Sequence, residues 1–103
     1  MVTMAFLAEM RQRMRIVDTG FDSELRALVE AARDDLRLAG VSKKAANDER
    51  DDLITAAIVT YVKSEFGLDT AEAEKYRQSY EMKRNKLAMS SRHTGGGGKR
   101  GCT

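Results

Sequence analysis

The fold of this chain is decided by residues 51–67, DDLITAAIVTYVKSEFG. The apolar residues of this stretch recur at three- and four-residue steps, which places them on one side of a helix: Ile54, Ala57, Ile58, Tyr61, Val62 and Phe66. Val59 widens that stripe, so we expect the helix to contact neighbours on more than one face. Acids at its start suit the positive end of the helix dipole, and Gly67 stands where a helix end favours a left-handed residue. The pattern predicts a central helix onto which the rest of the chain packs.

The composition limits which classes of protein this chain can belong to. The chain has 103 residues, of which 42% are apolar and 33% charged, so it predicts one small domain with a thin core. There is no run of about 18 apolar residues, and residues 1–14 lack the uninterrupted apolar stretch of a signal peptide. We therefore expect no membrane segment and a cytosolic origin. Cys102 is the only cysteine, so these residues offer neither an internal disulfide nor a cysteine metal site.

Three further helices are expected around the central one, which gives an all-α bundle of about four helices over roughly 4–15, 22–39, 50–66 and 70–90. In the first helix, one side carries Met4, Leu7, Met10 or Ala8, and Met14. In the second, the apolar side carries Leu25, Leu28, Val29, Ala32 and Leu36, and the opposite, exposed side carries Arg26, Glu30, Arg33, Asp34 and Arg37. The fourth has a narrow stripe of Ala73, Tyr76, Tyr80, Leu87 and the stem of Lys83. Such a helix often completes its burial against a partner subunit.

Turn and capping residues mark the helix ends. Asp22 is a candidate N-cap of the second helix, and Gly40 is expected to end it. Residues 41–48 have no strong pattern and are expected to form a polar surface loop, a candidate contact site, from which Asn47 or Asp48 caps the central helix. The pair Asp69 and Glu72 resembles a capping box for the fourth helix.

Charge divides the chain into two parts. Up to residue 81 it carries 16 acids and 12 bases, and from residue 82 onward it carries six bases and no acid. We therefore predict a helical domain, 1–91, and a glycine-rich basic tail, 92–103. The tail either docks on an acidic partner or is a solvated, disordered end. Two groups of bases are candidate contacts: Arg92, Lys99 and Arg100 in the tail, and Arg77, Lys83, Arg84 and Lys86 on the fourth helix.

No pattern typical of an enzyme is present. The single histidine, His93, lies in the expected flexible tail without a fixed acid or nucleophile nearby. The acid-rich stretch 48–52 lacks the alternating ligands and the sixth-position glycine of a calcium loop. Residues 95–98, four glycines, lack the lysine–serine pair and the strand–helix context of a phosphate-binding loop. We expect no catalytic activity, no cofactor and no metal.

A helix-turn-helix DNA-binding domain is disfavoured. The connection before the central helix is about ten residues, longer than the usual tight turn, and that helix starts with acids where base contacts belong. The basic fourth helix leaves non-specific contact with phosphates open.

The order of residues resembles the head–tail connector proteins of long-tailed DNA bacteriophages. The resemblance covers roughly residues 4–91 and rests on FDSEL (21–25), AARDDL (31–36), AGV (39–41), DLITAAI (52–58), YVK (61–63), FG (66–67), EKY (74–76), SYE (79–81), Leu87 and Ser90. These are common residue types and helix lengths rather than a catalytic signature. Residues beyond Arg92 fall outside it.

This resemblance implies a structural virion protein in the phage neck, assembled in the host cytoplasm into a ring beneath the portal that follows its twelve-fold symmetry. The ring would extend the DNA channel, help retain the genome and dock the next neck protein, whether a head-completion or a tail-terminator protein. Its partners would be identical copies, the portal, that next protein, and genomic DNA passing through without sequence-specific binding. An ordered tail would reach the portal or an adjacent subunit. The alternative is a small DNA-binding accessory factor in packaging, which would bind duplex DNA through the basic fourth helix and the tail.

Overall fold

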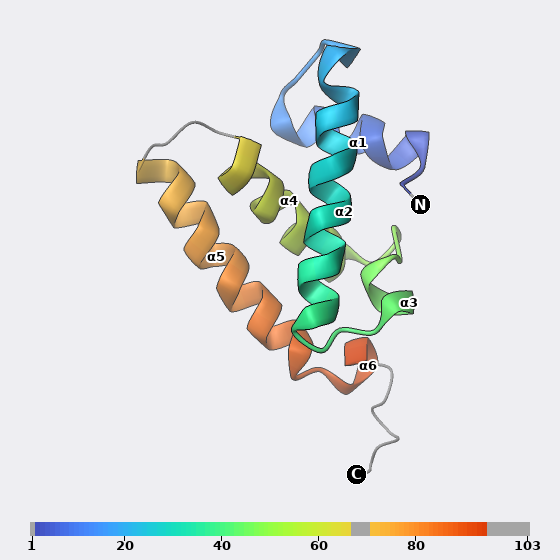
Figure 1. Cartoon of the computed structure of the whole chain (residues 1–103), viewed down its shortest axis with the longest axis vertical. Helices are drawn as coiled ribbons and strands as arrows, with labels where there is room; N and C mark the ends of the chain where they lie inside the picture. The colour runs from blue at the N-terminus through green and yellow to red at the C-terminus, as the bar shows by residue number, and fades with distance from the viewer. Residues whose placement is uncertain (1, 67–70, 95–103) are drawn as a thin grey trace.

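The computed structural model describes residues 2–66 and 71–94, and every regular element in these ranges is helical (Figure 1). In chain order they are α1 (Met4–Met14), the 3₁₀ turn η1 (Thr19–Phe21), α2 (Asp22–Leu38), α3 (Lys43–Ala46), α4 (Asp52–Phe66), α5 (Ala71–Ala88) and α6 (Ser91–Thr94). The expected all-α bundle is confirmed, since the four predicted helices correspond to α1, α2, α4 and α5. The short elements η1, α3 and α6 were not expected.

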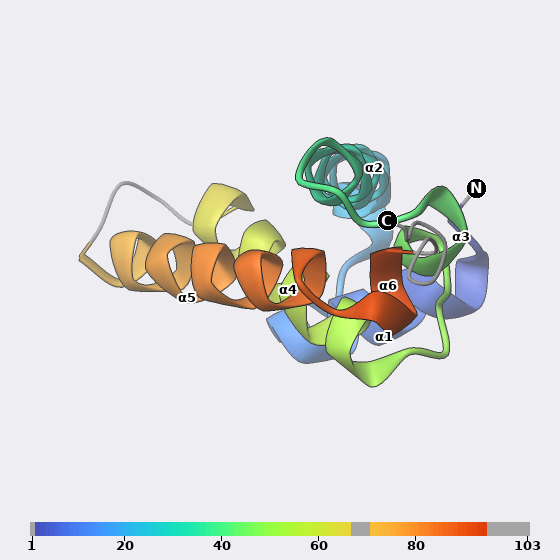
Figure 2. The same cartoon turned by 90° about the horizontal axis from the view of Figure 1, so that it is seen from below.

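Helix α4 lies at the centre, with α1, α2 and α5 packed around it (Figures 1 and 2). Its predicted apolar stripe is buried at Ile54, Ala57, Ile58 and Val62, each at most 1% exposed, and partly buried at Tyr61 and Phe66. Val59 is also buried, together with the polar Thr55 and Ser64. Helix α4 is therefore covered on more than one face, and its burial organises the core.

Helices α1 and α2 both pack on α4. The predicted buried side is correct for α2 and only partly correct for α1. The predicted stripe of α2 is confirmed, because Leu25, Val29, Ala32 and Leu36 are fully buried and Leu28 packs against them. On α1 the buried residues are Phe6, Leu7 and Met10, whereas Met4 is 80% exposed. The expected position of Met4 was wrong, because it lies roughly 100° around the helix axis from the centre of the buried face.

The helix starts use other caps than those expected. Asp22 does not cap α2, whose N-cap residue Phe21 makes no side-chain cap, and the Asp22 carboxylate instead accepts 2.8 Å hydrogen bonds from the Arg11 guanidinium. Asp51 caps α4, since its Oδ1 accepts from the backbone amides of Leu53 and Ile54. The expected caps Asn47 and Asp48 were therefore wrong. Local spacing alone does not distinguish among nearby residues that are all able to cap.

The helix ends agree where they are described. Helix α2 stops at Leu38, and Gly40 adopts a φ of 119°, a left-handed conformation that glycine accepts without strain, as predicted. The expected cap at Gly67 and the expected box that begins at Asp69 lie outside the described residues.

Residues 41–48 are more structured than the predicted polar loop. They contain α3, whose first turn is capped by Ser42 Oγ, which accepts a hydrogen bond from the Ala45 amide. Val41 is 3% exposed and Ala46 is fully buried. The prediction of a surface loop was wrong in part, because Val41 and Ala46 are buried in the core and the Ser42 cap lets residues 43–46 form one helical turn.

Truncating the centre of α4 tests this packing. We expect Ile58→Ala to lower the free energy of unfolding by about 2–5 kcal/mol, because it leaves a cavity where a side chain 1% exposed now packs. Leu53→Ala is the matched control on the same helix and is expected to cost less than about 1 kcal/mol, since Leu53 is 56% exposed. Urea unfolding measures both; equal losses would contradict the assigned faces of α4.

Candidate interaction surface

Helix α5 is held to the domain by a narrow stripe, as predicted. Among its 18 residues only Ala73, Tyr80 and Leu87 are buried, one at every seventh position. Met82, on the opposite side of the helix, is 62% exposed, and Met89, which directly follows the helix, is 85% exposed. One helix of the bundle therefore leaves most of its surface available for contact.

Tyr80 fastens the middle of α5 to α2. Its hydroxyl donates a 2.6 Å hydrogen bond to Asp35 Oδ2, and its ring meets the Tyr61 ring edge to face at 5.1 Å between centroids. Burial of the phenol, together with this bond to a carboxylate, raises the pKa of Tyr80 well above its ordinary value. Arg84 Nη1 reaches the same Asp35 oxygen at 3.3 Å. Arg84 thus neutralises an acid of its own domain.

The four bases of α5 that were predicted as candidate contacts separate into two kinds. Arg84 pairs with Asp35, and Arg77 pairs with Glu74 on its own helix. Lys83 donates to the Ser79 hydroxyl at 2.8 Å, which leaves its charge without an acid. Lys86 is exposed and has no hydrogen-bond or ion-pair partner among the described residues. Lys83 and Lys86 are therefore the two cations of this set that remain free to meet an outside acid.

These two lysines border an apolar pocket of about 160 Å³. Leu53 and Ala56 of α4 and Leu87 of α5 supply its apolar walls, and Lys83, Lys86, Ser90 and His93 complete the lining. Because Leu53 is 56% exposed at the mouth, an apolar side chain from outside could reach the pocket without any rearrangement of the core.

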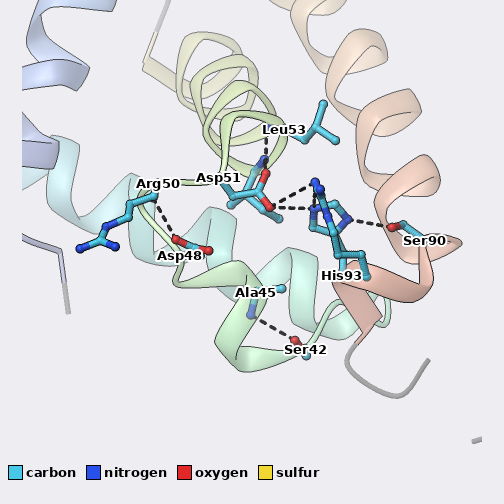
Figure 3. A network of polar contacts seen from close by, with 10 residues as sticks. Ser42, Ala45, Asp48, Arg50, Asp51, Leu53, Ser90 and His93 are labelled. Atoms are coloured by element: carbon cyan, nitrogen blue, oxygen red, sulfur yellow. Dashed lines mark hydrogen bonds and ion pairs between the residues drawn. The ribbon is translucent and has the colours of Figure 1, made fainter. Parts of the chain in front are cut away.

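Residues 90–94 close one end of this pocket through a network centred on His93 (Figure 3). His93 is 2% exposed; its Nε2 lies 2.8 Å from Asp51 Oδ2, and its Nδ1 lies 2.8 Å from Ser90 Oγ. The His93 carbonyl accepts from the Ser42 amide beside α3. The expectation of a histidine in a flexible tail, without a fixed acid, was wrong: α6 packs, and its acid comes from a residue 42 positions earlier.

The hydrogen bonds define the chemistry of this network. A carboxylate only accepts, so Nε2–H donates to Asp51, and in the neutral imidazole Nδ1 accepts from the Ser90 hydroxyl. A hydrolytic triad places serine on Nε2 and the acid on Nδ1, the reverse of this arrangement. The three residues instead act as a clasp, here called the His93 clasp, that ties α6 to the start of α4.

Asp51 carries two duties in this clasp, since one oxygen caps α4 and the other binds His93. Burial alone would raise the pKa of this carboxyl, but hydrogen bonds from the Ile54 amide and His93, followed by that from Leu53, outweigh it. The pKa of Asp51 therefore lies below its ordinary value of 3.8.

A second buried charge, which the sequence pattern missed, anchors the start of the chain. Arg33 was expected on the exposed side of α2 but is 2% exposed, with Nη2 3.0 Å from Glu49 and its guanidinium over the Phe6 ring. Glu49 also accepts from the amide and hydroxyl of Thr3. Burial would raise the pKa of Glu49, yet these hydrogen bonds lower it. Arg33 Nε and Nη1 have no hydrogen-bond partner among the described residues.

The predicted tail contacts are only partly described. Arg92 has a side chain 70% exposed and lies 3.6 Å from Asp51. Lys99, Arg100 and Cys102 lie outside the described residues. The structure therefore brings Arg92 to the His93 clasp and gives no position for the other predicted contacts.

Two other kinds of site are absent from the described part of the chain. Residues 2–66 and 71–94 contain no group of three or more His, Cys, Asp or Glu placed to hold a metal ion. None of the helices in these ranges combines the length and apolar character that crossing a membrane requires.

The described residues thus form a small helical bundle with one sparsely buried helix and a lysine-bordered apolar pocket. The family model described as Phage connector protein matches residues 6–94. The chain therefore belongs to the phage connector protein family, and the resemblance to head–tail connectors is confirmed. No curated protein and no solved structure match the chain.

Replacing Asp51 tests the clasp. At pH 7 we expect Asp51→Ala to lower the free energy of unfolding by about 1–3 kcal/mol, because it removes a helix cap and a charged hydrogen bond. The folded-state pKa of Asp51 is below 3.8, so its contribution is present above about pH 4 and lost as the pH falls through the folded pKa. The difference between variant and wild type, measured by urea unfolding, should shrink in acid.

The matched control for this change is Asp52→Ala, an exposed acid in the same first turn of α4, which should cost less than about 1 kcal/mol. A deficit of Asp51→Ala that is the same at pH 3 and pH 7 would refute the role of the Asp51 charge.

Proposed function

We propose that this protein is a head–tail connector of the virion, which forms a ring beneath the portal, extends the DNA channel and docks the next neck or tail protein. The observation that carries this proposal is the family match over residues 6–94. The ring, its twelve-fold symmetry and its position under the portal are parts of the proposal.

The fold supports an assembling protein. Helix α5 buries only three side chains in its own domain, and it leaves Met82 exposed on the opposite side, with Met89 exposed just after its last residue. Exposed methionines are suited to contacts that repack, because the side chain is flexible and polarisable. Lateral packing of identical subunits around a ring would cover such a face.

The alternative, a DNA-binding accessory factor in packaging, draws less support from the site. It needs the bases of α5 to face phosphates together, but Arg77 and Arg84 are paired with acids of the same domain. Lys83, Lys86 and Arg92 remain for such a role. A connector is expected to bind free duplex DNA weakly, whereas the accessory factor should bind it with a steep dependence on salt.

The copy number in the particle tests the proposed function. Quantitative mass spectrometry of purified, DNA-filled particles should find this chain in the same number of copies as the portal protein. Its absence from such particles would remove the connector proposal and favour the accessory factor.

A second test concerns the tail. We propose that Lys99 and Arg100, with Arg92, contact the portal or the adjacent subunit. Replacing Lys99 and Arg100 by Glu should reduce attachment to isolated portal at least tenfold, as measured by co-sedimentation, while helicity by circular dichroism stays unchanged. This variant keeps His93, so the clasp is undisturbed; exchange of the two bases for Gln should give an intermediate loss. Attachment unaffected by the Glu variant would contradict the proposed contact.

A further inference from the structure

The outer side of α2 presents an apolar residue next to an acid. Ala27, Asp34 and Leu38 are exposed and lie opposite the buried stripe of this helix. Leu38 is 87% exposed at the last position of α2. The Asp34 side chain, one turn earlier, is 68% exposed and makes only a long, 3.4 Å contact to Arg37. Leu38 and Asp34 together are here called the α2 knob.

The lysine-bordered pocket is lined by residues of α4, α5 and the segment 90–93, and by none of α2. In Figure 2, α2 forms the upper side, whereas α1 and the first turn of α4 form the lower side. Leu53, at the pocket mouth, belongs to that first turn and stands between α4 and α5 in Figure 3.

The knob and the pocket are complementary in size and charge. Apolar cavities of about 150 Å³ hold benzene, which is larger than a leucine side chain, so a pocket of about 160 Å³ accepts one. Lys83 and Lys86 border the pocket without an acid partner, and the knob supplies the carboxylate of Asp34. Opposite charges around an apolar contact fix its register and disfavour other partners.

We infer that the occupant of the pocket is the α2 knob of a second copy of this chain, with Leu38 inserted between Leu53 and Leu87 and Asp34 paired with Lys86. The contact joins two different surfaces, so each copy uses one side for each neighbour. Such a heterologous contact continues from copy to copy and closes into a ring when the rotation between copies permits. The inference rests on the proposed function in that it names the interface of the proposed ring.

Cross-linking in assembled particles tests this interface. In a Cys102→Ser background, the full-length chain carries both Asp34→Cys and Lys86→Cys, and a short bismaleimide is added to purified particles. We expect a ladder of covalent oligomers. Each single cysteine variant should remain monomeric, because surfaces of the same kind do not meet. The control pairs Asp34→Cys with Lys75→Cys, an exposed position of α5 outside the pocket, and should give no ladder.

Three results would overturn the inference. They distinguish a failure of the proposed interface from a failure of the proposed function. Dimers from either single variant would indicate a symmetric contact instead. A double variant that is present in portal copy number but gives no ladder would refute the interface and leave the connector proposal standing. A chain missing from wild-type particles would refute both.

Charge reversal gives an independent readout. Lys86→Glu should lower the number of copies per particle at least tenfold, and addition of Asp34→Lys should restore it, because the pair is re-formed with opposite signs. Lys75→Glu is the matched control and should leave the copy number unchanged. Circular dichroism checks that each variant folds, which we expect since all three positions are exposed. Loss in Lys86→Glu without rescue would contradict the proposed pair.

Discussion

The structure depends on the need to cover α4. This helix is apolar over more than half of its circumference, so a single neighbouring helix cannot remove it from water. Helices α1, α2 and α5 each contribute part of the cover, and residues such as Ala57 allow them to approach closely. Because three helices share one small core, none of them is fully buried. The outer sides of α2 and α5 therefore remain available for contacts with other chains.

The start of α4 also ties the two ends of the described chain together. Glu49 binds Thr3 at the beginning of α1 and the buried Arg33 of α2. Two residues later, Asp51 caps α4 and accepts a hydrogen bond from His93 of α6. These two carboxylates join four helices within three residues of sequence. The carboxylates of Glu49 and Asp51 thus hold the other helices to the start of the core helix.

Periodicity could predict the large elements but not these links. The stripes of α2 and α4 follow from the 3.6-residue repeat, and the structure agrees with both. Arg33 was assigned to the exposed side because it is charged, although its long apolar stem allows burial once Glu49 meets the guanidinium. His93 stands beside four glycines, which indicate a linker, and its acid lies far away in the sequence. Contacts of this kind depend on tertiary structure, which no local pattern contains.

The candidate interface also could not be predicted from local sequence patterns. A basic α5 was predicted from composition, but only the structure separates Arg77 and Arg84, which are paired within the domain, from Lys83 and Lys86 beside the pocket. The pocket itself needed α4, α5 and α6 to be placed together. The family, in contrast, followed from the order of residues along the chain, and the match over residues 6–94 agrees with it.

The most direct test of this account is an electron cryomicroscopy map of the neck in purified particles. The account predicts a closed ring of this helical domain directly beneath the portal, with the outer side of each α2 against the α4–α5 pocket of the next copy. Density beneath the portal that these helices do not fit would contradict it.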